Sequence, residues 1–141
     1  MPYLTSCIRD RGMAMPELVI PGRLPGLNEY IAAERSNRYR AAAMKREAEA
    51  LVLLHAKSCL RKWKQSCPVI MYYHWLEKDR RRDMDNISSY GRKVIQDALV
   101  KGGYLRGDGW EHIVGFTDGF SVDKKCPRIE VEIVEVDPCG I

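Results

Sequence analysis

Two carboxylates, Asp83 and Asp85, stand two residues apart, directly after a basic run and before a helix-forming stretch. In extended backbone, side chains two apart point the same way, so both carboxylates can face one point. A divalent cation relieves their mutual repulsion, and hard oxygen ligands suit Mg²⁺ or Mn²⁺. For such a motif taken alone, helix capping by Asp85 or Asn86 is the favoured alternative, because Asp and Asn are common caps.

Further candidates follow along the chain. Lys93 and Asp97 stand four residues apart, which places them on one polar strip of the expected helix. An ordinary exposed ion pair is the alternative for these two residues. Asp108 and Glu111 follow in a glycine-rich loop, where Asp-Gly is also a common turn. A third carboxylate can therefore return to the acidic pair from the far end of the helix.

Basic residues are concentrated in two segments of this chain, whose net charge is +4. Residues 35–64 contain nine basic and two acidic residues, and Arg80, Arg81 and Arg82 directly precede the acidic pair. Arginines beside carboxylates pair with them or bind nearby phosphates, whereas a solvated charge run is the alternative. The distribution favours a polyanionic partner.

Taken together, these residues resemble the RusA family of Holliday-junction resolvases, which are small metal-dependent endodeoxyribonucleases. The family pattern is a basic run, Asp-x-Asp-Asn, a helical lysine, Asp-Ala-Leu, a glycine and an acidic loop residue. It corresponds here to Arg80–Arg82, Asp83-Met-Asp85-Asn86, Lys93, Asp97-Ala98-Leu99, Gly102-Gly103 and Asp108.

The resemblance implies an Mg²⁺-dependent enzyme, with Mn²⁺ as another metal, that resolves four-way DNA junctions by paired phosphodiester hydrolysis in recombination and repair. It implies a homodimer, because two symmetric cuts need two sites. The alternatives are a non-catalytic DNA-binding module with a decayed acidic site, and a metal-dependent hydrolase of other nucleic-acid substrates. The implied catalytic residues are Asp83, Asp85, Lys93 and Asp108, the metal ligands are the three aspartates among them, the DNA-binding residues are Arg80, Arg81, Arg82 and Asn86, and Asp97 and Glu111 are secondary candidates.

Composition limits the class of protein. The 141 residues fit one domain, and 45% hydrophobic with 30% charged residues is typical of a globular chain. The apolar runs fall far short of the ~20 residues of a membrane span, and no signal peptide is expected. Five cysteines without a CxxC motif predict reduced thiols in a cytoplasm, and three dispersed histidines do not suit zinc.

The elements that must position these residues follow from periodicity and from Pro and Gly. We expect a loose arm over residues 1–12 and one domain over residues 13–141. The order β-α-β-α-β-β predicts an α+β domain with one mixed sheet and helices packed on it. The expected elements are strand 17–20, a helix from Glu29 to about Lys64 that Asn28 caps and that breaks near Ser36-Asn37, strand 69–76, a helix from about Asn86 to Lys101, and strands 113–120 and 128–136.

Overall fold

The computed structural model describes residues 15–136, so the expected arm of residues 1–12 lies outside the described residues. The expected order of elements is confirmed, and the first helix is divided in two. In chain order the elements are β1 (Glu17–Pro21), α2 (Leu27–Ser36), α3 (Arg38–Cys59), β2 (Val69–Glu77), α4 (Met84–Lys101), β3 (Ile113–Val122) and β4 (Arg128–Glu135).

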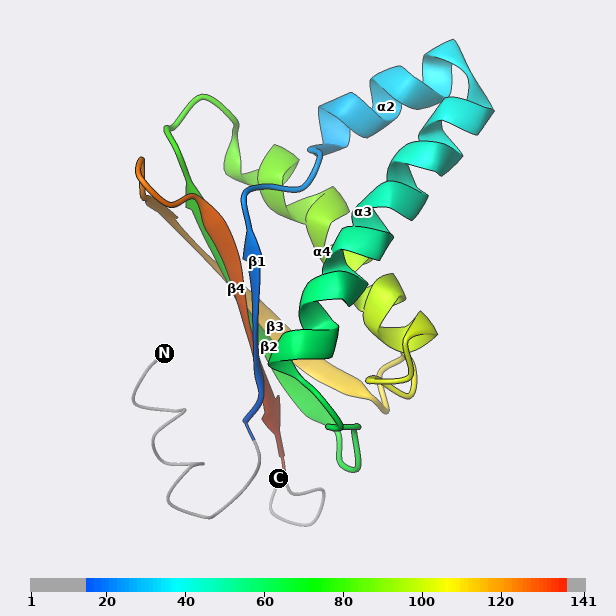
Figure 1. Ribbon diagram of the computed structural model, residues 1–141, viewed down its shortest axis with the longest axis vertical. Coiled ribbons are helices and arrows are strands. Elements are labelled where there is room, and N and C mark those ends of the chain that lie inside the picture. The colour runs from blue at the N-terminus through cyan, green and yellow to red at the C-terminus, as the bar shows by residue number, and fades with distance from the viewer. Residues whose placement is uncertain (1–14, 137–141) are drawn as a thin grey trace.

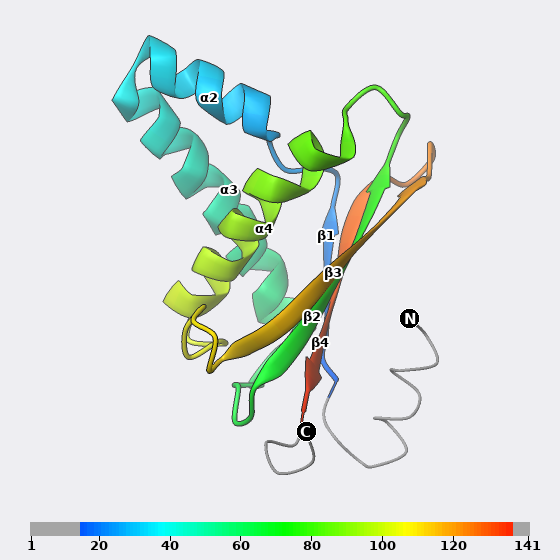
Figure 2. The ribbon, with the colours of Figure 1, turned by 180° about the vertical axis from the view of Figure 1, so that it is seen from behind.

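The strands form one mixed sheet in the order β1-β4-β2-β3. β2 and β3 are parallel, whereas β4 is antiparallel to both β1 and β2. All three helices lie on one face of this sheet, as the two opposite views show (Figures 1 and 2). The α+β fold expected from the sequence is therefore confirmed.

Alternation along the central strands decides which side chains face the helices. Met71, Tyr73 and Trp75 of β2 lie at most 1% exposed, and they pair in register with β4 residues that belong to the same core. The amphipathic helix α4 covers this surface, because its apolar residues recur every three or four positions. The buried apolar residues of α4 are Ile87, Tyr90, Val94, Ile95, Ala98 and Leu99.

The break between α2 and α3 lies at Asn37, as expected. Its backbone is extended, and its side-chain Oδ1 accepts a hydrogen bond from the Tyr39 N–H at 2.8 Å, which caps α3. The outer boundaries differ from expectation. α2 begins at Leu27, with Gly26 instead of Asn28 at the cap position, and α3 already ends at Cys59.

The boundaries of α4 carry the main correction. The helix begins at Met84, so Asp83 occupies the N-cap position and Asp85 lies in the first helical turn. The expectation that Asp83 and Asp85 both stand in extended backbone is therefore wrong. The other end is confirmed: α4 stops at Lys101, and Gly103 adopts a φ of +82°, a conformation that favours glycine.

Two expectations about class meet a partial test. Within residues 15–136, no helix combines the length and the apolar composition needed to cross a membrane. Cys59, Cys67 and Cys126 carry free thiols, as expected for reduced cysteines.

Candidate functional site

Helix α4 presents the candidate residues, and it packs directly against the Trp75 side chain of β2 at Gly91. A Cβ added at Gly91 would lie 2.7 Å from the Trp75 ring, so a larger residue would push the helix away from the strand. This contact fixes the next two residues, Arg92 and Lys93, at the border between the core and solvent. The Trp75 side chain is 1% exposed and therefore forms a rigid base for that part of the helix.

A chain of charged side chains surrounds Lys93. Its ammonium lies 3.2 Å from Asp97 Oδ1 and 3.6 Å from Asp108 Oδ2, which joins the helix to the loop after it. The other oxygen of Asp97, Oδ2, accepts a hydrogen bond from Lys45 of α3 at 2.7 Å. We call Lys45, Asp97, Lys93 and Asp108 the lysine network. Three of these residues were expected near the site, and the structure brings those three together.

The lysine network favours the charged forms of two of its members, Asp97 and Lys93. Burial would raise the pKa of Asp97, but hydrogen bonds and charges from Lys45 and Lys93 outweigh it and hold that pKa below its usual value. The hydrogen bond that Lys93 donates to Asp97 raises the pKa of Lys93, with a smaller contribution from Asp108. Lys93 is therefore a cation at neutral pH, and 58% of its side chain is exposed to solvent, so that a ligand can reach it.

The acidic pair lies at the start of the same helix. Asp83 and Asp85 are both exposed, and Asp83 makes no side-chain capping hydrogen bond. The capping alternative named Asp85 or Asn86, but both lie inside α4, and the N-cap position belongs to Asp83. Both carboxylates are open to solvent and to a ligand.

The expected convergence of three carboxylates is not present. Asp108 contacts Lys93, which lies eight residues beyond Asp85, or about 12 Å along the helix axis at ~1.5 Å per residue. In the part of the chain that the structure describes, no group of three or more His, Cys, Asp or Glu side chains is arranged to hold a metal ion. Glu111 is 74% exposed and contacts His112, at 3.5 Å, and not the lysine network.

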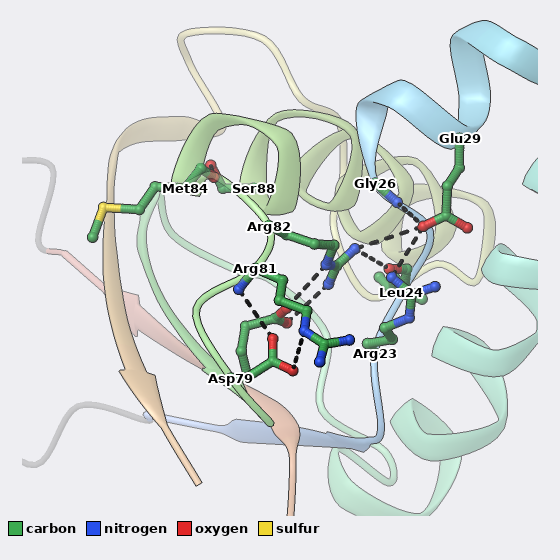
Figure 3. A network of polar contacts seen from close by, with 10 residues as sticks. Arg23, Leu24, Gly26, Glu29, Asp79, Arg81, Arg82, Met84 and Ser88 are labelled. Carbon is green, nitrogen blue, oxygen red and sulfur yellow. Dashed lines mark hydrogen bonds and ion pairs between the residues drawn. The ribbon is translucent and has the colours of Figure 1, made fainter. Parts of the chain in front are cut away.

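The three consecutive arginines have different environments. Arg82 donates two hydrogen bonds to the Glu77 carboxylate, at 2.9 and 2.8 Å, and one to the Leu24 carbonyl at 3.1 Å. Its side chain is only 15% exposed, and Figure 3 shows it at the centre of a polar network that reaches Glu29. Arg82 therefore connects the end of β2 to the loop before α2, and little of its side chain remains exposed for the expected DNA contact.

Arg80 and Arg81, by contrast, face solvent. Arg81 pairs with Asp79 and remains 86% exposed (Figure 3). Both arginines line an open groove of about 810 Å³, to which the turn between β3 and β4 contributes Lys124. The other lining residues of this basic groove are Lys78, Asp79 and Val122. Lys124 could not be recognised from the sequence as a residue of this groove, because only the folded sheet brings the β3–β4 turn beside the β2–α4 loop.

Asn86 also has a structural contact. Its Oδ1 accepts a hydrogen bond at 2.8 Å from the N–H of Asn28, in the first turn of α2. The side chain packs so closely on Gly26 that an added Cβ would lie 2.8 Å from Oδ1. Asn86 therefore caps α2 from another helix, in addition to Glu29 of α2, whose side chain accepts a hydrogen bond from the N–H of the N-cap residue Gly26.

Sequence reasoning missed two sets of residues. Lys45 is one of many basic residues on α3, and nothing in its spacing distinguishes it. Asp118 of β3 accepts hydrogen bonds from Trp75 Nε1, at 2.9 Å, and from Arg92, whose guanidinium also lies 4.6 Å from the centre of the Phe116 ring. Asp118 is a charged residue in the middle of the edge strand β3. A charged residue at such a position was the one feature of the sequence that could have indicated a polar contact there.

The comparisons with known proteins give no assignment. No protein-family model matches the chain, and no curated protein shows significant similarity to it. The chemistry must therefore be inferred from the side chains. They provide two exposed carboxylates, an exposed cation held by two carboxylates, and a basic groove beside the start of α4.

Proposed function

We propose that this chain is a RusA-like, Mg²⁺-dependent endodeoxyribonuclease that resolves four-way DNA junctions. The observation that carries this proposal is the meeting of Lys93 with Asp97 and Asp108. Each of these residues has an ordinary surface role when considered alone. Their assembly around one exposed ammonium, on the helix that begins with Asp83 and Asp85, is what a site for a phosphodiester would use.

The acidic pair fits Mg²⁺ by chemistry. Asp83 and Asp85 offer hard, exposed oxygen donors, and Mg²⁺ is usually held by one or two carboxylates with water and substrate phosphate completing its shell. A third carboxylate is therefore not required for binding. When bound there, Mg²⁺ would activate water and offset charge on the reacting phosphate.

The residues of the chain supply orientation and charge. Lys93 would stabilise the negative charge that develops on the phosphoryl oxygens or on the leaving oxygen, as a fixed cation in a partly shielded site can. Asp97 would hold Lys93 in place, since it accepts a hydrogen bond from the ammonium and is itself 16% exposed. Asp108, at 49% exposed, is the more open of the two carboxylates in the lysine network and can exchange its contact for a ligand.

The basic groove would bind the DNA backbone. Lys78, Arg80, Arg81 and Lys124 surround it, and its one carboxylate, Asp79, already pairs with Arg81. Phosphate contacts from such residues provide affinity without sequence selectivity. Paired cuts across a symmetric junction would require two copies of this site, and hence a homodimer.

Incubation of the purified chain with a synthetic four-way junction, beside a linear duplex of the same sequence, tests the proposal. We expect paired nicks in the junction that need Mg²⁺ or Mn²⁺ and are absent with a chelator. Binding without any nicking would favour a non-catalytic DNA-binding module. Equal cleavage of both substrates would favour a hydrolase of other nucleic-acid substrates. Either result would contradict the proposed resolvase.

A further inference from the structure

Two lysine–carboxylate ion pairs connect α3 to α4. Lys45 of α3 lies 2.7 Å from Asp97 of α4, and Lys101 of α4 lies 2.8 Å from Glu49 of α3. The pairs stand side by side, since Lys45 and Glu49 are four residues apart, as are Asp97 and Lys101. They differ in one respect. Only the Lys45–Asp97 pair continues to Lys93, and through Lys93 to Asp108.

The two oxygens of Asp97 have separate partners. Oδ2 accepts from Lys45, whereas Oδ1 faces Lys93 at 3.2 Å. A carboxylate anchored through one oxygen has a fixed orientation at the other. Lys45 and Asp97 are 31% and 16% exposed, so water competes only partly for this contact.

Lys93, in contrast, has a long side chain that is 58% exposed. Such a side chain samples many rotamers unless a fixed partner selects one. The orientation of the Asp97 carboxylate thus selects the rotamers of Lys93 that bring its ammonium near Asp108.

We propose that Lys45 is a positioning residue, which holds the Asp97 carboxylate so that Lys93 is directed toward the site near Asp108. The expected effect on nicking rests on the proposed function, whereas the positioning of Lys93 by Lys45 through Asp97 does not. It assigns a role to a residue on the other helix, 52 positions earlier in the sequence, which reaches Asp97 through one hydrogen bond across the α3–α4 interface.

A double-mutant cycle tests the proposal. We expect Lys45→Met to lower kcat for junction nicking about tenfold, since small displacements of a catalytic group are costly. KM and junction affinity should change little. In an Asp97→Asn background, Lys45→Met should have almost no further effect, because both changes break the same chain of contacts. Lys45→Arg should restore most of kcat. If the decrease in kcat in the double variant equals the product of the decreases in the two single variants, the proposal is overturned.

Lys101→Met is the matched control, because it breaks the neighbouring ion pair of the same kind. It leaves the 6% exposed Glu49 without its partner, so it should destabilise the fold in denaturant at least as much as Lys45→Met. We expect wild-type kcat for the folded Lys101→Met protein. If it loses kcat as Lys45→Met does, the effect is one of general helix packing and the positioning role is refuted.

A second readout does not depend on activity. Isotope-labelled reductive methylation gives each lysine an NMR signal, and the signal of Lys93 is identified by its loss in Lys93→Arg. Lys45→Met should shift the Lys93 signal, and Lys101→Met should leave it in place. An unchanged Lys93 signal in Lys45→Met overturns the proposal even if the protein nicks junctions. A shifted signal in a protein without nuclease activity supports the positioning role and contradicts only the proposed function.

Discussion

The two ends of the candidate site show opposite relations between sequence and structure. At the start of α4, the conspicuous arginine run includes Arg82, which the fold uses internally in a bidentate pair with Glu77. Farther along α4, the inconspicuous Lys93 is the centre of a network that draws on three elements. The difference teaches that a charge run says little about which of its members are free to bind. Tertiary contacts decide that, one residue at a time.

The largest expected effect concerns the acidic pair. Asp83→Asn or Asp85→Asn should lower junction nicking by about a thousandfold or more, because each change removes a ligand for the metal that activates water. Junction binding should be retained or become tighter, since a negative charge facing phosphate is lost. Nicking rates and gel-shift affinities at millimolar Mg²⁺ measure both. Full activity in either variant would exclude the metal site from the start of α4.

The next effect separates the loop acids. Asp108→Asn should lower nicking about a hundredfold, because Asp108 contacts Lys93 and is placed to act in the site. Glu111→Gln, three residues away, should have a distinctly smaller effect, since Glu111 lies outside the lysine network. Both variants replace a loop carboxylate with the corresponding amide, so single-turnover rates compare them directly. A larger loss of nicking in Glu111→Gln than in Asp108→Asn would mean that the active residues lie near the start of the third strand instead of near Lys93.

Much of the fold could be predicted from sequence, and so could the proximity of Lys93, Asp97 and Asp108. Alternation in β4, the apolar strip of α4 and the glycines after Lys101 are local signals, and the structure confirms each element. The start of α4 was misplaced because Asp83, Asp85 and Asn86 suit both a loop and a first helical turn. The contact of Asn86 with α2 and that of Lys45 with Asp97 join residues more than fifty positions apart. Periodicity carries no information about such contacts.

A third prediction tests the division among the arginines. Arg82→Ala should lower the free energy of unfolding by about 2 kcal/mol or more, because the Glu77 carboxylate, 12% exposed, would lose its partner. Arg80→Ala should change it by less than about 0.5 kcal/mol, as is usual for exposed residues without special contacts. Urea unfolding of the two variants provides the measurement. Equal stabilities would show that the Arg82 network adds nothing to the fold.

The salt dependence of binding should divide the arginines in the opposite way. Arg80 and Arg81 replaced together by Ala should reduce the slope of log affinity against log salt by about 1 to 2, because each phosphate contact releases about one counterion. Lys124→Ala should add a further reduction if the basic groove is continuous across the turn. If the salt dependence of binding decreases only in folded Arg82→Ala protein, Arg82 contacts DNA and the exposed Arg80 and Arg81 do not, which would contradict this prediction.

The smallest effect concerns pH and the lysine network. The pKa of Asp97 is lower in the folded chain than its ordinary value, because hydrogen bonds from Lys45 and Lys93 outweigh its burial. A carboxylate with a lowered pKa stabilises the fold above its unfolded-state pKa of about 4, and this contribution disappears as the pH falls through its folded-state value. Asp97→Asn should therefore lose less stability than wild type between neutral pH and pH of about 3. The difference should be at most about 1 kcal/mol, because Lys93 is largely exposed. Lys45→Met should show part of the same change, since it removes one of the two donors to Asp97. Parallel curves of stability against pH for all three proteins would mean that solvent screens the charges of the lysine network. The two ends of α4 would then differ in where their charged residues lie, but not in how strongly those charges stabilise the fold.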